Sequence, residues 1–120
     1  MTRRRQNVET ALTKAIEVAI GSRRDARVWR NNVGAARTKS GFIRFGVVGQ
    51  ADLSGILLGG RRLELEVKTD SGSQSPSQKA FGEMIARFGG VYAVVRSVDE
   101  AVAVVDQALE EEGRRGQPGE

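Results

Sequence analysis

The stretch ADLSGILLGGRRLELEVK, residues 51–68, predicts two β-strands joined by a turn. Apolar residues fill both halves, and the glycine pair at 59–60 between them is typical of a β-hairpin. Asp52 stands near the start of the first strand, and Glu66 and Lys68 stand at the end of the second. The hairpin therefore brings two acids and one amine onto neighbouring strands.

The length of the hairpin loop decides which side chains share a face. A two-residue loop would set Asp52 opposite Val67, with its carboxylate on the wrong side of the sheet. A three-residue loop over 59–61 would set Asp52 opposite Lys68 and diagonal to Glu66. We expect the odd-length loop, or a bulge with the same effect, with one of the two glycines at positive φ. In the second strand charged and aliphatic residues alternate, so one face carries Glu64, Glu66 and Lys68 and the other carries Leu63, Leu65 and Val67.

The chain contains no histidine and no cysteine, which removes most competing chemistries. A Ser-His-Asp triad, an imidazole base, a thiol nucleophile and an ordinary zinc site are all excluded. Carboxylates, lysines and hydroxyls remain, and oxygen ligands favour hard cations such as Mg²⁺ or Mn²⁺. Asp52, Glu66 and Lys68 on adjacent strands suit metal-assisted cleavage of a phosphodiester.

The length and charge of the chain limit its possible domain organisation and binding partners. The chain has 120 residues, of which 39% are hydrophobic, and this predicts one domain over 1–112 with a flexible polar tail over 113–120. The net charge is +4, from 19 basic and 15 acidic residues, which weakly favours a polyanionic partner. No stretch approaches the roughly 20 apolar residues that span a bilayer, and the basic start has no apolar signal core. We therefore expect a soluble, cytoplasmic protein.

Hydrophobic periodicity and capping residues predict the remaining elements. Residues 31–39 are expected to form a loop. The order helix, strand, strand, strand, helix, strand, helix indicates an α/β fold with a mixed β-sheet flanked by helices. The predicted helices cover about 7–20, 76–88 and 98–112, and the predicted strands about 27–30, 51–58, 62–68 and 91–95, with a further short extended segment at 41–45.

The first predicted helix turns one acid toward the protein. At about 100° per residue, the centre of its apolar stripe lies near Ala19. Glu9 then lies on the shoulder of the stripe and Glu17 almost opposite. Glu9 can therefore look into the protein, whereas Glu17 looks at water.

Seen together, several segments resemble a known family, the VRR-NUC domain of the PD-(D/E)XK nuclease superfamily in its small stand-alone phage and bacterial form. The likeness extends from Glu9 to about Ala103, and it implies a restriction-endonuclease-like core. Ala51 stands where the superfamily's name has proline, a residue that carries no chemistry. The matching segments are Glu9, Val28–Asn32, Arg44–Gly46, Gly49–Leu53, Glu66–Lys68, Ser77-Gln78, Gly89-Gly90 and Val94–Ser97.

The resemblance implies a role for each matched residue. Glu9, Asp52, Glu66 and the backbone carbonyl of Val67 would hold the Mg²⁺ or Mn²⁺ ion. Lys68 would orient or help deprotonate the attacking water and offset charge on the phosphate. Contacts with the DNA backbone or the scissile phosphate would come from Arg30, Arg37, Lys39, Arg44, Gln78 and Lys79.

Local sequence leaves alternatives for several of these residues. Asp52 could be an ordinary strand-entry aspartate. Gln78 fits a capping box with Ser75 as well as it fits a contact with the substrate. Glu64 fits an exposed neighbour of the site better than a ligand. Trp29, the only tryptophan, fits a core position better than a base-stacking platform.

The hypothesis is a metal-dependent DNA endonuclease that cuts branched, Holliday-junction-like DNA as a homodimer, in a bacterial or phage-infected host cell. A flap or nicking nuclease inside a larger phage assembly is one alternative. A non-catalytic DNA-binding or assembly protein that retains the nuclease fold is another. The intact set of Asp52, Glu66 and Lys68 favours an enzyme.

Overall fold

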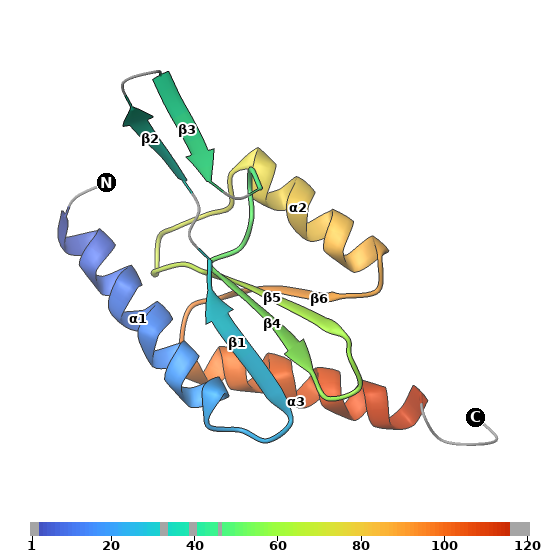
Figure 1. The fold of residues 1–120 in the computed structure, drawn as a ribbon. Helices are drawn as coiled ribbons and strands as arrows, with labels where there is room; N and C mark the ends of the chain where they lie inside the picture. The colour runs from blue at the N-terminus through green and yellow to red at the C-terminus, as the bar shows by residue number, and fades with distance from the viewer. Residues whose placement is uncertain (1–2, 32–33, 39–40, 46, 116–120) are drawn as a thin grey trace.

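The chain folds into three helices and six strands in the computed structural model, which describes residues 3–31, 34–38, 41–45 and 47–115 (Figure 1). The predicted α/β class is confirmed. One element was missed, because a strand lies inside the segment expected to be a loop. The elements are α1 (Arg3–Gly21), β1 (Ala26–Arg30), β2 (Gly34–Thr38), β3 (Gly41–Phe45), β4 (Leu53–Leu57), β5 (Arg62–Val67), α2 (Pro76–Arg87), β6 (Val91–Val95) and α3 (Val98–Arg115).

Four strands form the central mixed sheet, in the order β1-β4-β5-β6. β1, β4 and β5 pair antiparallel, whereas β5 and β6 pair parallel because α2 carries the chain back between them. β2 and β3 pair with each other as a separate two-stranded sheet, which stands away from the body in Figure 1. The strand that the sequence analysis missed is thus half of a projecting hairpin.

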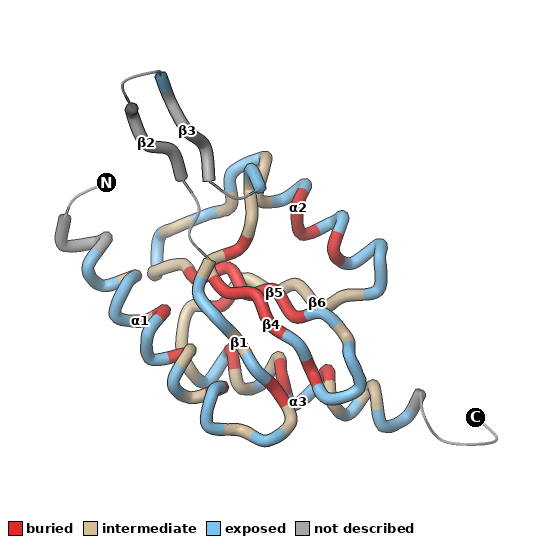
Figure 2. Tube along the Cα trace, in the orientation of Figure 1, coloured by how far each residue is buried: buried red, intermediate tan, exposed pale blue. Residues whose placement is uncertain are grey.

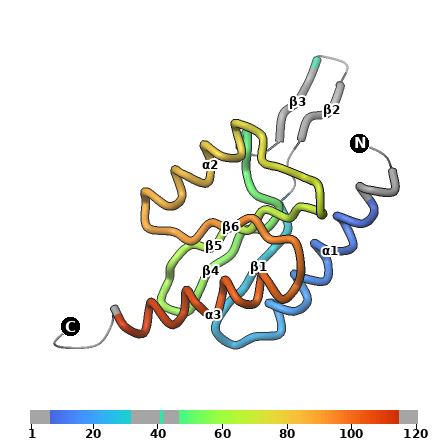
Figure 3. The backbone as a smooth tube through the Cα atoms, turned by 180° about the vertical axis from the view of Figure 1, so that it is seen from behind, coloured from blue at the N-terminus to red at the C-terminus, as the bar shows by residue number. Residues whose placement is uncertain are grey.

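The two faces of the central sheet are covered differently. α1 and α3 pack against one face, where Ile16, Leu65 and Val105 belong to a continuous aliphatic core. Figure 2 shows buried segments, in red, on the central strands and on the helices. Figure 3, the view from behind, shows α3 running along the sheet. α2 covers the other face with a smaller cluster that includes Phe81 and Ala51. The large core and the small cluster thus lie on opposite sides of the same strands.

The β4–β5 turn has the predicted odd length but lies one residue earlier than expected. Leu57 N donates to Arg61 O at 2.9 Å, which leaves residues 58–60 as the loop. Both glycines of the loop have positive φ, at 104° and 99°. Leu58 stays outside the β4–β5 ladder because its N–H donates to Asp25 O at 2.8 Å on the other side.

The register of this hairpin follows from the turn. Leu53 pairs with Leu65 and Ser54 with Glu64. Continuing the register by one residue sets Asp52 opposite Glu66. The expected pairing of Asp52 with Lys68 is therefore wrong by two residues, but the face is the predicted one. No helix among the described residues is long and apolar enough to cross a bilayer.

Candidate active site

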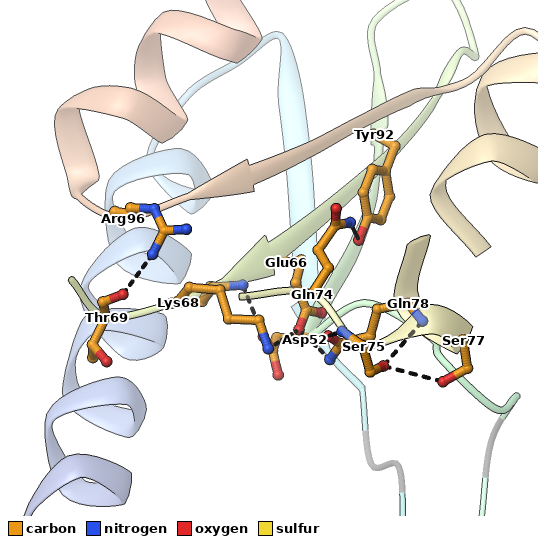
Figure 4. A network of polar contacts seen from close by, with 11 residues as sticks. Asp52, Glu66, Lys68, Thr69, Gln74, Ser75, Ser77, Gln78, Tyr92 and Arg96 are labelled. Carbon is orange, nitrogen blue, oxygen red and sulfur yellow. Dashed lines mark hydrogen bonds and ion pairs between the residues drawn. The ribbon is translucent and has the colours of Figure 1, made fainter. Parts of the chain in front are cut away.

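Two acids lie beside each other where β4 begins and β5 ends (Figure 4). Asp52 directly precedes β4, and its Oδ2 accepts a hydrogen bond from Val67 N at 2.8 Å. Glu66 is the penultimate residue of β5 and is only 2% exposed. The bond to the backbone of Val67 holds the carboxylate of Asp52 next to that of Glu66.

One oxygen of Glu66 is held from two sides, and the other is left open. Gln78 Nε2 donates to Glu66 Oε2 at 2.7 Å, and Lys68 Nζ lies 3.4 Å from the same oxygen. Glu66 Oε1 is buried and has no hydrogen-bond partner among the described residues. A buried carboxylate oxygen without a donor is unfavourable unless another positive group approaches it. The arrangement therefore leaves one buried carboxylate oxygen that a cation could satisfy.

Burial raises the pKa values of both acids, and repulsion by Asp52 adds to the rise at Glu66. Burial raises the pKa of Asp52, and the N–H of Val67 and the charges of Lys68 and Arg30 only partly oppose it. Burial raises the pKa of Glu66 to about 7, and the neighbouring charge of Asp52 adds to the rise. The fully ionised pair is thus disfavoured in the protein alone, and a divalent cation would relieve that penalty.

The side-chain amide of Gln78 serves two structures at once. Its Oε1 accepts from Ser75 N at 2.9 Å, and Ser75 Oγ accepts from Gln78 N at 3.2 Å, which completes a capping box at the start of α2. Its Nε2 is the group that donates to Glu66. The capping interpretation is confirmed, and the same amide also reaches the acid pair.

The 69–75 loop between Lys68 and α2 is fastened at both ends (Figure 4). Arg96 Nη1 donates to Thr69 O at 2.6 Å, and Gln74 Nε2 donates to Tyr92 Oη at 2.9 Å. Sequence reasoning did not single out Arg96, Gln74 or Tyr92 for these contacts. Their partners lie on other elements, so no local pattern marks them.

A second buried acid lies one strand repeat away from Glu66. Glu64 is 0% exposed, and it accepts from Ser54 Oγ at 2.9 Å and from Arg62 Nε at 2.6 Å. The expectation that Glu64 would be an exposed neighbour is wrong. Its face of the sheet is covered, and the two donors satisfy its oxygens.

Asn31 ties this network to the candidate site. Its Nδ2 donates to Ser54 Oγ at 2.7 Å and to Ala51 O at 2.9 Å. Its backbone N–H donates to Asp52 O at 2.9 Å. The main chain on both sides of the aspartate peptide is therefore fixed from β1.

The other predicted metal ligands, Glu9 and Val67, differ in how the structure relates them to the acid pair. Glu9 lies on α1 with its side chain half-buried, and no group of three or more acids among the described residues is arranged to hold a metal ion. The structure thus brings together Asp52 and Glu66 but does not join Glu9 to them. The main chain of Val67 lies at the site through its bond to Asp52.

Two of the predicted DNA contacts can be located. Arg30 is exposed at the end of β1, and its charge acts on the pKa of Asp52, so it lies near the acids. Lys79 is exposed in the first turn of α2, next to Gln78. Arg37 falls in β2 and Arg44 in β3, but their side chains, like the whole of Lys39, lie outside the described residues.

Comparison with known proteins gives a match at the level of the fold. A solved structure described as a VRR_NUC domain protein superposes with a TM-score of 0.60 at 18% sequence identity, covering 85% of this chain and 88% of that chain. No family model matches the sequence, and no curated protein matches it. The chain therefore shares the fold of a VRR_NUC domain protein, as its motifs predicted.

Proposed function

We propose that this chain is a Mg²⁺- or Mn²⁺-dependent endonuclease that hydrolyses phosphodiester bonds in DNA. The observation that carries the proposal is the buried Glu66 carboxylate, which is held on one oxygen by Gln78 and Lys68 and open on the other, with Asp52 beside it. The fold shared with a VRR_NUC domain protein supports a nuclease. Without histidine or cysteine, few other reactions suit these groups.

The donor set fits a small hard cation. Asp52, Glu66 and the carbonyl of Val67 offer only oxygen, and Mg²⁺ is commonly bound by one or two carboxylates while it keeps several waters. Glu9 is the candidate for a further carboxylate from α1. When bound, such an ion acidifies water and polarises a phosphoryl oxygen.

Lys68 and Gln78 prepare the site for an anionic substrate. The ammonium of Lys68 is largely buried, with 14% of its side chain exposed, so its charge acts through little solvent. It would offset charge on the phosphate and orient the attacking water. Gln78 fixes Glu66 in the orientation that leaves Oε1 free.

The DNA would lie across the face of the sheet that carries these acids. Arg30, whose charge acts on Asp52, and Lys79, next to Gln78 in α2, would contact phosphates near the pair, and Arg37, Lys39 and Arg44 remain the other candidate phosphate contacts. A symmetric homodimer would present two sites for paired cuts on a branched, Holliday-junction-like substrate. A chain of 120 residues has little surface of its own for such a substrate.

The test is cleavage of supercoiled plasmid and of a synthetic four-way junction in Mn²⁺, Mg²⁺ and EDTA. Wild type should cut in either metal and not in EDTA, whereas Lys68→Ala and Asp52→Asn should bind the DNA but cut at least about 100-fold more slowly. Equal cleavage by all three proteins would assign the activity to a contaminant or to another site. Junction binding without cutting by any of them would favour a non-catalytic DNA-binding protein.

A further inference from the structure

Three cross-strand rows follow one another on the face of the sheet that bears the acids. The first row is Arg27–Ile56–Arg62, from β1 through β4 to β5. The second is Trp29–Ser54–Glu64–Tyr92, and the third continues through Asp52 and Glu66. Directly paired residues project from the same face. The sheet therefore presents a basic and apolar row, an aromatic row and an acidic row in sequence.

Trp29 is the exposed member of the middle row. It is 49% exposed, which corrects the expectation that it would be a core residue. The small cluster under α2 is built on Phe81, Ile85 and Tyr92 and does not include it. Its indole N–H has no hydrogen bond to any described residue. A half-exposed indole thus lies beside buried, hydrogen-bonded Ser54 and Glu64.

The spacing relates Trp29 to the acids. Ser54, its partner in β4, is two residues from Asp52, which at about 3.3 Å per residue is roughly 7 Å along the strand. Asn31, which directly follows β1, lies two residues from Trp29 and bonds to both Ser54 and the main chain of Asp52. The indole is therefore held on the same rigid strands as the site, one step away from it.

We propose that Trp29 is a stacking platform for an unpaired nucleotide base next to the phosphate that the acids address. This proposal rests on the proposed nuclease function and, among branched DNAs, selects substrates with unpaired nucleotides at the cut, such as a flap, over a fully paired four-way junction. Aromatic side chains stack on any base, but a base inside an intact duplex offers no free face. Ile56, 45% exposed in the neighbouring row, extends the apolar surface.

Charge favours DNA over a second copy of the chain as the occupant. Arg27 on β1, in the row beside Trp29, is exposed, and the side chain of Arg62 on β5 is 55% exposed. A two-fold pairing of this face would bring these guanidinium groups against their own copies. A nucleic acid strand would bring phosphates to them.

The single tryptophan makes the test specific, because its fluorescence reports one residue. Wild type in EDTA is titrated with three probes of equal length: a duplex with a four-nucleotide unpaired segment, the same duplex with that segment abasic, and a fully paired duplex. The segment with bases should quench the emission in a saturable way. The abasic and fully paired probes should leave it nearly unchanged.

Substitutions give the second readout. Trp29→Ala should weaken binding of the probe with unpaired bases about 5- to 100-fold and leave the abasic probe unaffected. Trp29→Phe should retain most of the affinity, which guards against a folding defect in the alanine variant. Phe88→Ala is the matched control, because Phe88 is 75% exposed but follows the opposite end of α2. It should leave all three affinities unchanged.

The outcomes separate this proposal from the nuclease proposal. Equal quenching by the abasic probe, or no quenching on binding, would overturn the stacking role even if the protein cuts DNA. A shift of emission with protein concentration in the absence of DNA would instead make the patch an interface between copies. Base-dependent quenching by a protein that cuts no DNA would support the stacking role and overturn the nuclease proposal.

Discussion

The two faces of β4 and β5 use alternate residues of the same strands in opposite ways. Toward α1 and α3 the strands present Leu53, Leu65 and Val67, which pack into a dry aliphatic core. Toward α2 they bury Glu64 and Glu66, each next to cationic or polar groups. The first face stabilises the fold by removing apolar area from water, whereas the second accepts buried charge, which raises the pKa of Glu66.

The largest effect should come from substituting two adjacent residues, one on each face. Leu65→Ala should lower the free energy of unfolding by about 2–5 kcal/mol, because it leaves a cavity in the core. Glu66→Gln should not lower it at pH 8, yet should slow DNA cleavage at least about 100-fold. Urea unfolding and initial cleavage rates measure the two effects. Equal destabilisation by both variants would contradict the division between the faces.

The pH dependence of stability should sharpen the same comparison. In EDTA the folded protein holds the proton of Glu66 up to a pKa of about 7, whereas the ordinary value is 4.5. Between these two values the folded state binds more protons than the unfolded state. The contribution of Glu66 to the free energy of unfolding is therefore complete below about pH 4.5. It falls by ~3 kcal/mol as the pH rises through about 7.

The measurement is urea unfolding of wild type and Glu66→Gln between about pH 4 and pH 8. As the pH rises, the free energy of unfolding of wild type should fall relative to that of Glu66→Gln. Added Mg²⁺ should restore wild type at pH 8 and not the variant. A difference that does not depend on pH would mean that Glu66 titrates normally.

Substitutions of Gln78 should separate the effects of its side-chain hydrogen bonds to Ser75 and to Glu66. Gln78→Ala removes both and should lower stability by about 0.5–2 kcal/mol through the cap alone. Gln78→Glu can still accept from Ser75 N, so stability should be largely retained, but its charge would face Glu66. We expect slower cleavage by this variant with a pH profile moved upward, since a like charge raises the pKa of Glu66. Unchanged kinetics would confine Gln78 to the cap.

The smallest effect on stability should come from Trp29. Because about half of its surface is open, Trp29→Ala should lower the free energy of unfolding by less than about 1 kcal/mol, against the 3–5 kcal/mol typical of a buried aromatic residue. Thermal or urea unfolding decides between the two. A loss of about 3–5 kcal/mol in the free energy of unfolding would instead mean that Trp29 packs as a core residue.

The elements that sequence predicted well are those set by strong local patterns. The aliphatic alternation around Leu65, the glycines of the turn and the capping box at Ser75 each determine local geometry through near neighbours. The odd loop length followed from requiring Asp52 and Glu66 to share a face. The structure bears out both the turn parity and the shared face.

What local sequence could not supply depended on contacts between distant segments. The hairpin register shifted because Leu58 bonds to Asp25, which lies 33 positions earlier. Glu64 is buried because donors arrive from Ser54 and Arg62 while α2 covers the face, and no pattern in β5 distinguishes it from a solvated acid. Trp29 is exposed because α2 leaves the β1 side of the sheet open, which is a matter of helix placement.

The shared amide of Gln78 links the first turn of α2 to the charge at Glu66. A cation that withdraws electron density from Glu66 would weaken its hold on Nε2, and the same side chain would then be freer to leave Ser75. The backbone N–H groups of Gln78 and Lys79 both donate to Ser75 and would open more often as a result. Hydrogen–deuterium exchange at these two amides would thus register ion occupancy at a carboxylate twelve residues away in sequence.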